Sequence, residues 1–163
     1  MTLKRALFLL LAALAGTAVA QMQPRSKNQT CTLPDVAAAW AKPHSAMATR
    51  LDTVAADQAG EAGQPYRGEL KPCSGPHCKP GQYFGMFPVR VLLPGRYRVA
   101  VDVPLWIDVV TETGLAEGLM CEHTGCDPVR KIMQFELKTG VQWIALSGAR
   151  PGEVGFALLP VRD

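Results

Sequence analysis

The feature that most constrains the fold is an alternation of side-chain character with a period of two, the period of a half-buried β-strand. It runs through residues 96–103, stops at Pro104 and resumes in residues 105–111. The positions expected to face a core are all odd-numbered: Tyr97, Val99, Val101, Val103, Leu105, Ile107 and Val109. An α-helix, with 3.6 residues per turn, would scatter these side chains around its axis. The segment therefore predicts two strands, with Pro104 as a place where a bulge could reset the phase.

Other segments with strand character follow in regular succession, separated by glycine and proline turns. We expect strands within residues 87–93, 132–138, 141–146 and 154–161, and one or two more within residues 45–72. Residues 113–128 are rich in glycine, cysteine and acidic side chains, which indicates a loop. Many short strands in succession are typical of antiparallel sandwiches. The sequence thus predicts an all-β fold, an antiparallel β-sandwich of jelly-roll-like form.

The first twenty residues have the pattern of a targeting segment rather than of a folded element. Lys4 and Arg5 precede the apolar run Ala6–Leu14, and Ala18–Ala20 has the small-x-small form of a signal-peptidase site. The apolar run is too short to span a bilayer. We therefore expect a signal peptide over residues 1–20 and cleavage near Ala20-Gln21. The mature chain would be periplasmic or secreted, without a transmembrane segment.

The remaining chain is expected to hold one domain. Residues 21–33 are polar and predict a flexible leader, and residues 34–163 are long enough for a single β-sandwich with its own core. Pro34 and Pro43 bracket the run Val36–Trp40, which predicts one short N-terminal helix.

The charge of the chain gives no indication of a polyanionic partner. The full sequence has 17 Lys and Arg against 14 Asp and Glu, but Lys4 and Arg5 belong to the signal segment. The mature chain is then nearly neutral and carries no block of like charge. This balance disfavours a nucleic acid as partner.

Two Cys-x4-Cys segments are the first candidates for chemistry. Cys73–Cys78 encloses His77, and Cys121–Cys126 encloses His123. Thiolates and imidazoles at this spacing are able to form a zinc site. In an oxidising compartment the favoured prediction is disulfides, either as two small loops or as a crossed pair between the segments. Cys31 is left over; it could replace any of these partners or form an intermolecular bond.

A second group of candidates lies on the face of residues 96–109 that is opposite the expected core. These even-numbered residues are Arg96, Arg98, Asp102, Trp106 and Asp108. An indole beside carboxylates and guanidinium groups suits sugar stacking with hydrogen-bonded hydroxyls, or a calcium-assisted ligand site. The alternative is structural, with residues 112–128 folded over Trp106 and Asp108 paired with an arginine. The ligand-binding candidates are Trp106, Asp108, Asp102 and Arg98.

The chain has the residue types of a mononuclear iron site without their usual pattern. Such a site needs two histidines and a carboxylate on one face of the metal. The candidates are His44, His77, His123 and Glu122. Residues 122 and 123 are adjacent and would point to opposite sides of a strand, which favours surface histidines over ligands.

Motifs of nucleophilic or phosphate chemistry are absent from the sequence. It contains no Gly-x-Ser-x-Gly, no His-Glu-x-x-His and no glycine-rich phosphate loop. Ser147 is interpreted as a turn serine at a strand end. Arg130 and Lys131 are interpreted as solvated charges at a strand start, where they discourage strand addition.

Four segments, taken in order, resemble a family of small exported proteobacterial proteins of unknown function. They are Gly-Arg-Tyr-Arg-Val-Ala (95–100), Leu-Trp-Ile-Asp-Val-Val (105–110), Arg-Lys-Ile-Met-Gln-Phe-Glu-Leu (130–137) and Leu-Ser-Gly-Ala (146–149). The match covers roughly residues 45–163, and its strands are similar to those of pre-peptidase C-terminal β-sandwich domains, so the resemblance implies that fold. Some members carry the label homogentisate dioxygenase. That enzyme is a much larger iron protein of another fold, so the label implies little about activity.

From these patterns we expect an exported, non-catalytic β-sandwich protein with a binding or envelope-associated role and no cofactor. The partner would be a small ligand, a glycan or an envelope protein. One alternative is a carbohydrate or small-ligand module that uses Trp106 and Asp108. A further alternative is a metal-dependent enzyme, with iron or zinc held by His77, Glu122 and His123.

Overall fold

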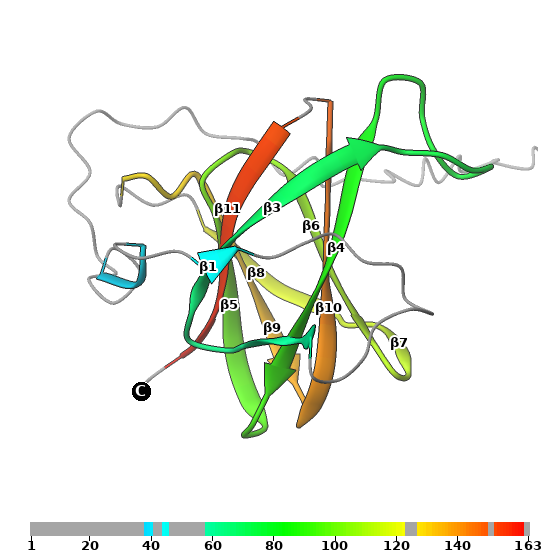
Figure 1. Ribbon diagram of the computed structural model, residues 1–163. Helices are drawn as coiled ribbons and strands as arrows, with labels where there is room; N and C mark the ends of the chain where they lie inside the picture. Colours follow the sequence, from blue (N-terminus) through cyan, green and yellow to red (C-terminus); the bar gives the residue numbers. More distant parts are fainter. Residues whose placement is uncertain (1–37, 41–43, 46–57, 123–126, 150–151, 162–163) are drawn as a thin grey trace, which may run out of the picture.

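The computed structural model describes residues 38–40, 44–45, 58–122, 127–149 and 152–161. Strands dominate this part of the chain, and the predicted all-β sandwich is confirmed (Figure 1). The predicted signal peptide and leader lie outside the described residues. Ala38 and Ala39 are helical, while the rest of the expected N-terminal helix also lies outside them. Among the described residues, no helix has the length and apolar character needed to cross a bilayer.

The described residues form an 11-stranded sheet. Its strands are β1 (His44–Ser45), β2 (Gly60–Glu61), β3 (Pro65–Pro72), β4 (Tyr83–Val91), β5 (Gly95–Val101), β6 (Trp106–Thr111), β7 (Gly114–Leu115), β8 (Gly118–Glu122), β9 (Lys131–Leu137), β10 (Gly140–Gly148) and β11 (Gly152–Pro160). The main order is β7-β6-β10-β4-β3-β11-β5-β9-β8. Neighbours along this order pair antiparallel, whereas the short strands β1 and β2 pair in parallel with β3 and β4.

The sheet curls into two layers because strand β3 belongs to both. Residues 65–70 of β3 pair with β11, and then Lys71 and Pro72 pair with β4. The first layer consists of β3, β11, β5, β9 and β8; the second consists of β4, β10, β6 and β7 (Figure 1). Strands β7 and β8 form the two ends of the strand order, although they follow each other directly in the chain.

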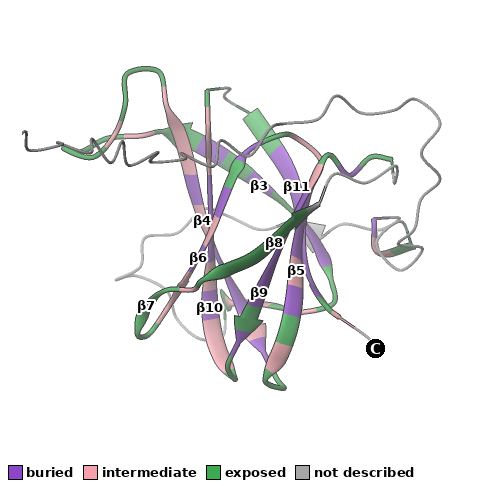
Figure 2. Cartoon of the chain, turned by 180° about the vertical axis from the view of Figure 1, so that it is seen from behind, coloured by how far each residue is buried: buried purple, intermediate pink, exposed green. Residues whose placement is uncertain are grey.

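The core fills the space between the layers, and the predicted odd-numbered face is the buried one. Figure 2 shows buried positions in strands of both layers. The core cluster includes Tyr97, Val99 and Val101 from β5 together with Leu105, Ile107 and Val109 from the β6 region, and the partly buried Val103 packs against it. Pro104 lies in the connection between β5 and β6, and the phase continues through it unchanged. Across the layers, the ring centroids of Phe87 and Phe156 are 4.6 Å apart.

The outer face of the first layer carries a second apolar cluster. Its members are Trp40, Ala100, Val129, Ile132, Ala157 and Leu159. This cluster explains why Ala100 occupies a position that the alternation assigned to the polar side. The first layer is thus apolar on both faces over part of its area.

Two predicted boundaries were wrong. Residues 113–128 were expected to be a loop, but they contain β7 and β8. Strand β8 lies at the sheet edge with Leu119 and Met120 exposed, so it has no alternation of buried and solvated positions to detect. Strand β4 begins at Tyr83 rather than at residue 87. Gly85 interrupts the alternation of apolar side chains in its first half, because it has no side chain at an inward-facing position. A Cβ atom on Gly85 would lie 2.7 Å from the ring of Phe87, which occupies that inward position instead.

Candidate functional site

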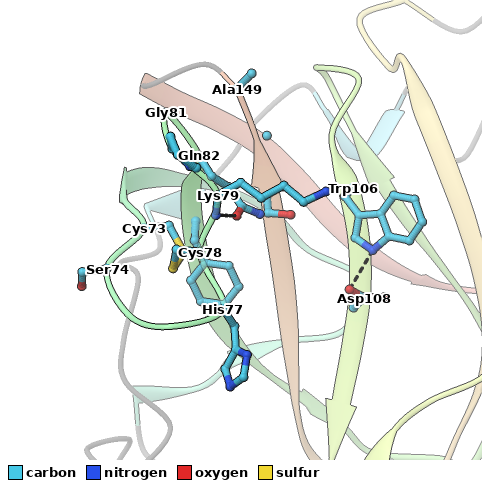
Figure 3. A pocket seen from close by; sticks show the side chains of 14 residues that line it. Cys73, Ser74, His77, Cys78, Lys79, Gly81, Gln82, Trp106, Asp108 and Ala149 are labelled. Atoms are coloured by element: carbon cyan, nitrogen blue, oxygen red, sulfur yellow. Dashed lines mark hydrogen bonds between the residues drawn. A yellow bond between two sulfur atoms is a disulfide. The ribbon is translucent and has the colours of Figure 1, made fainter.

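An open groove of about 840 Å³ lies at one end of the second layer. One wall is the loop 73–82 between β3 and β4, and the opposite wall is formed by the first residues of β6 (Figure 3). The last residues of β10, Ser147 and Gly148, lie between them together with Phe84 of β4. We call this the β6 groove. Its volume is in the range of small-molecule sites, which is about 300–1,000 Å³.

Strand register positions the β6 wall and the floor of the β6 groove relative to each other. Trp106 is directly opposite Ser147, and Ser147 is directly opposite Phe84 on the other side. Residues directly opposite each other in an antiparallel pair project from the same face of the sheet. The three side chains therefore form one row across β6, β10 and β4, on the face turned away from the core. Asp108 belongs to the adjacent row, opposite Ala145.

Trp106 is exposed and yet held in position. The residue has 66% of its surface accessible, and its indole N–H donates to Oδ2 of Asp108 over 2.8 Å (Figure 3). The two residues are two positions apart in one strand, so the pleat brings them to the same face. The ammonium group of Lys131 lies 5.5 Å from the ring centroid, within the range of a cation–π contact. A hydrogen bond of 2.9 Å from Lys131 Nζ to the carbonyl of Leu105 fixes that amine.

The wall formed by residues 73–82 is held by a disulfide and by short-range hydrogen bonds. Cys73 and Cys78 are bridged, with their Cα atoms 5.6 Å apart. The N–H of Cys73 donates to the carbonyl of Gln82 over 2.8 Å, and the N–H of Gln82 donates to the carbonyl of Lys79 over 3.0 Å. The side chain of Gln82 then accepts from the N–H of Lys79 over 2.9 Å. This network holds the backbone of the loop in the shape that forms the wall.

The first Cys-x4-Cys segment is therefore a small disulfide loop, as we expected for a protein in an oxidising compartment. This bridge excludes both the crossed pairing and a zinc site that uses these two sulfurs. Cys121 does not form the expected second bridge: its thiol is free and exposed. Among the described residues, β9 is the strand paired with β8, and it places Met133 opposite Cys121. Cys31 and Cys126 lie outside the described residues.

The predicted grouping of Arg98 and Asp102 with Trp106 and Asp108 was wrong. All four are on the side of their strands opposite the core, but β5 and β6 belong to different layers. Their outward faces therefore point away from each other. Neither Arg98 nor Asp102 lines the β6 groove. The alternation of apolar and polar residues predicted correctly which face of each strand is buried, but it does not indicate which layer of the sandwich each strand belongs to.

Asp102 has a structural environment instead. Its Oδ1 accepts from the N–H of Gly155 over 2.8 Å, and its own N–H donates to the carbonyl of Gly155 over 3.1 Å. Burial raises the pKa of the Asp102 carboxyl above its ordinary value. The hydrogen bond from Gly155 and the charges of Arg67 and Arg130 oppose that shift without cancelling it. Asp102 thus joins the start of the β5–β6 connection to β11.

The candidate metal ligands are not brought together in the described structure. His77 lines the β6 groove, but its imidazole is directed away from Trp106 and Asp108 (Figure 3). The backbone of His44 pairs with Tyr66 in β1 and β3, and Glu122 ends the edge strand β8. His123 lies outside the described residues. Over residues 58–122, 127–149 and 152–161, no three His, Cys, Asp or Glu side chains gather in a metal-binding arrangement.

The β6 groove also brings together a serine, a histidine and an aspartate, which the sequence had left apart. Ser147, His77 and Asp108 all line it. A nucleophilic triad needs a hydrogen bond from serine to histidine and another from histidine to the carboxylate. Among the described residues no such bond joins them, and Asp108 uses Oδ2 to accept from the indole of Trp106. In this conformation the three residues contribute separate polar groups to the groove.

Several groove residues carried no signal in the sequence. Lys79, Gln82 and Phe84 lie in or next to a loop whose charges follow no period. Lys131, which does not line the groove, was interpreted as a solvated charge, but its ammonium group lies over the ring of Trp106. The i, i+2 relation between Trp106 and Asp108 was the one detectable pair, because it depends only on strand geometry.

The fold and the β6 groove define the chain as an all-β sandwich with an aromatic-walled surface groove at one end. No model of a known protein family matches the chain, and no curated protein is similar to it in sequence.

Proposed function

We propose that this chain is an exported, non-catalytic binding protein that holds a small ligand of the carbohydrate class in the β6 groove. The observation that carries the proposal is Trp106, whose indole is both exposed and oriented by Asp108. An exposed indole leaves a large apolar face in water, and a ligand that covers it recovers that burial. Its fixed orientation means that little side-chain entropy is lost when the ligand binds.

Sugars match this combination of surfaces. The C–H face of a pyranose ring packs on an indole, while its hydroxyls need polar partners around the rim. Asp108 retains Oδ1 for a hydroxyl, since Oδ2 already accepts from Trp106. Ser147 and Gln82 add a hydroxyl and an amide to the same groove. A concave surface with one aromatic wall and a few placed polar groups is the usual form of a small-molecule site.

Export is supported by the N-terminal pattern and by the cysteine chemistry. Residues 1–20 have a basic start, an apolar run and a small-x-small cleavage site. The disulfide between Cys73 and Cys78 is of the kind that persists in oxidising compartments. The resemblance to a family of small exported proteins, which rests on residues 95–149, agrees with both. In the envelope such a module would bind a free sugar or a surface glycan.

Titration of the mature protein with a panel of oligosaccharides, followed by tryptophan fluorescence and calorimetry, tests the proposal. We expect at least one oligosaccharide to bind and Trp106→Ala to remove that binding. Leu115→Ala is the matched control, because Leu115 is 72% exposed and does not line the groove. The proposal is wrong if no oligosaccharide binds, if binding survives in Trp106→Ala, or if Leu115→Ala loses binding to the same extent.

A further inference from the structure

The charge distribution of the β6 groove carries an inference about its ligand. Lys79 follows the disulfide-closed ring directly, in the loop 73–82, and its side chain extends toward Trp106 (Figure 3). The backbone N–H of Lys79 is fixed by Gln82. Within the described part of the chain, the ammonium group itself has neither an ion pair nor a hydrogen bond. Its backbone is thus held while its ammonium group is exposed and unpaired among the described residues, on the wall that faces the indole.

A second cation lies beside the same indole. The ammonium group of Lys131 is 5.5 Å from the ring centroid of Trp106 and uses one of its three donors for the carbonyl of Leu105. Among the residues that line the β6 groove, Asp108 is the one acidic side chain, and its Oδ2 is engaged by the indole N–H. The surroundings of the exposed indole are therefore cationic overall.

We infer that the ligand of the β6 groove is an acidic sugar, a hexuronate unit of an oligosaccharide. The inference rests on the proposed function and specifies its ligand class. The pyranose ring packs on Trp106, and the carboxylate on that ring forms a charge-assisted hydrogen bond with Lys79. The ring hydroxyls meet Oδ1 of Asp108 and the hydroxyl of Ser147.

The geometry favours this class over neutral sugars and over phosphates. A neutral sugar uses the indole and leaves the Lys79 ammonium to water. A phosphate group carries more charge but no apolar ring face, so a phosphate alone leaves Trp106 uncovered. A uronate has an apolar ring face, hydroxyls and one carboxylate in a single unit, which is the set of partners that Trp106, Asp108 and Lys79 present.

The test compares matched ligands on matched variants. Oligogalacturonates, oligomannuronates and hyaluronan tetrasaccharide are titrated into the mature disulfide-bonded protein by calorimetry at low salt. The methyl ester of each serves as control, because it keeps the ring and removes the charge. Cello-oligosaccharides and inorganic phosphate are the neutral and phosphate arms. The variants are Lys79→Gln, Trp106→Ala and Lys138→Gln, in which Lys138 is an exposed lysine outside the groove.

We expect one of the uronates to bind at least fivefold more tightly than its methyl ester. Lys79→Gln removes that preference and weakens the acid form about five- to tenfold, the range of a partly exposed charged hydrogen bond. Trp106→Ala abolishes binding of both forms, and Lys138→Gln changes neither. High salt weakens the acid form alone.

The outcomes separate this inference from the proposed function. If cello-oligosaccharides or the esters bind as well as the acids and depend on Trp106, the sugar site stands and the acidic specificity is wrong. If inorganic phosphate competes fully, the cations select an anion without the ring, and the inference is likewise overturned. If none of the sugars binds, both the inference and the carbohydrate assignment are wrong.

Discussion

Asp102 and Gly155 hold each other through two hydrogen bonds, although 53 residues separate them in the chain. The carboxylate of Asp102 lies where a Cβ atom on Gly155 would be, with Oδ2 only 2.5 Å from that position. The glycine is therefore required for the close approach of the carboxylate. This contact connects β11 to the segment that passes from one layer of the sandwich to the other.

The raised pKa of Asp102 predicts a specific pH dependence of stability. Because burial raises the pKa in the folded state above the unfolded value of about 3.9, the folded protein binds this proton more tightly. The resulting stabilisation is present below the unfolded pKa and is lost as pH rises through the folded pKa. We expect the wild type to gain stability relative to Asp102→Asn as the pH falls from 7 to about 4. Urea unfolding of both proteins at several pH values measures this difference, and a constant gap would contradict it.

Trp106→Ala is expected to leave the fold intact. A buried tryptophan costs about 3–5 kcal/mol on truncation to alanine, but Trp106 is 66% exposed and belongs to no core cluster. The free energy of unfolding should therefore change by about 0.5 kcal/mol or less. Phe156→Ala, at a fully buried position, should cost several-fold more. Chemical denaturation of the three proteins distinguishes the two roles.

Gly68 makes room for a core aromatic ring. A Cβ atom on Gly68 would lie 2.0 Å from Cε1 of Phe87, so Gly68→Ala forces the ring to move. Overpacking of this kind costs about 1–3 kcal/mol. The smaller Phe87→Leu should be less damaging in the Gly68→Ala background than in the wild type. A double-mutant cycle measures this coupling, and strictly additive effects would show that the ring does not need the space.

The disulfide between Cys73 and Cys78 is expected to act on both stability and the groove. Closing so short a ring stabilises by about 2 kcal/mol through the entropy of the unfolded chain, and Cys73→Ser with Cys78→Ser should lose about that much. Since the ring forms one wall of the β6 groove, the same variant should also bind sugar more weakly. Thermal unfolding and calorimetry report the two effects. Full retention of binding would mean that the wall does not need the bridge.

Cys121 is expected to react as an accessible thiol in the folded protein. Its position on the edge strand β8 is exposed and unbridged. In a thiol titration without denaturant, Cys121→Ser should lose one equivalent relative to the wild type, whereas Cys73→Ser should gain one through the released Cys78. Equal thiol counts in the wild type and Cys121→Ser would contradict the assignment.

Sequence periodicity predicted the architecture because burial of one strand face is a local property. The odd-numbered residues from Tyr97 to Val109 lie in or against the core, since two-residue alternation follows directly from the pleat. The edge strand β8 was not predicted because it has no buried face. Among the described residues it pairs with β9 alone, and its apolar side chains Leu119 and Met120 are exposed. Its sequence therefore shows no alternation of apolar and polar positions.

Only those contacts of the candidate site that lie within one strand could be predicted from the sequence. Trp106 and Asp108 share a strand face, and their pairing followed from a spacing of two. Lys131 approaches the ring of Trp106 from across the end of the sandwich, and Lys79 extends toward it from the loop between β3 and β4 (Figure 3). Such contacts depend on the order of strands in the sheet, which a single sequence does not reveal. The same limitation placed Asp102 and Arg98 in the wrong group.

The two ends of the strand order, β7 and β8, are separated in the chain only by Ala116 and Glu117. The two edge strands of the sheet are therefore joined by a two-residue connection. If β8 separates from β9, it displaces the residues next to β7, so we expect loss of one edge strand to disturb the other. Cleavage at residues 116–117 would break this direct link between the two edges, while the turn between β9 and β10 would still join the two layers.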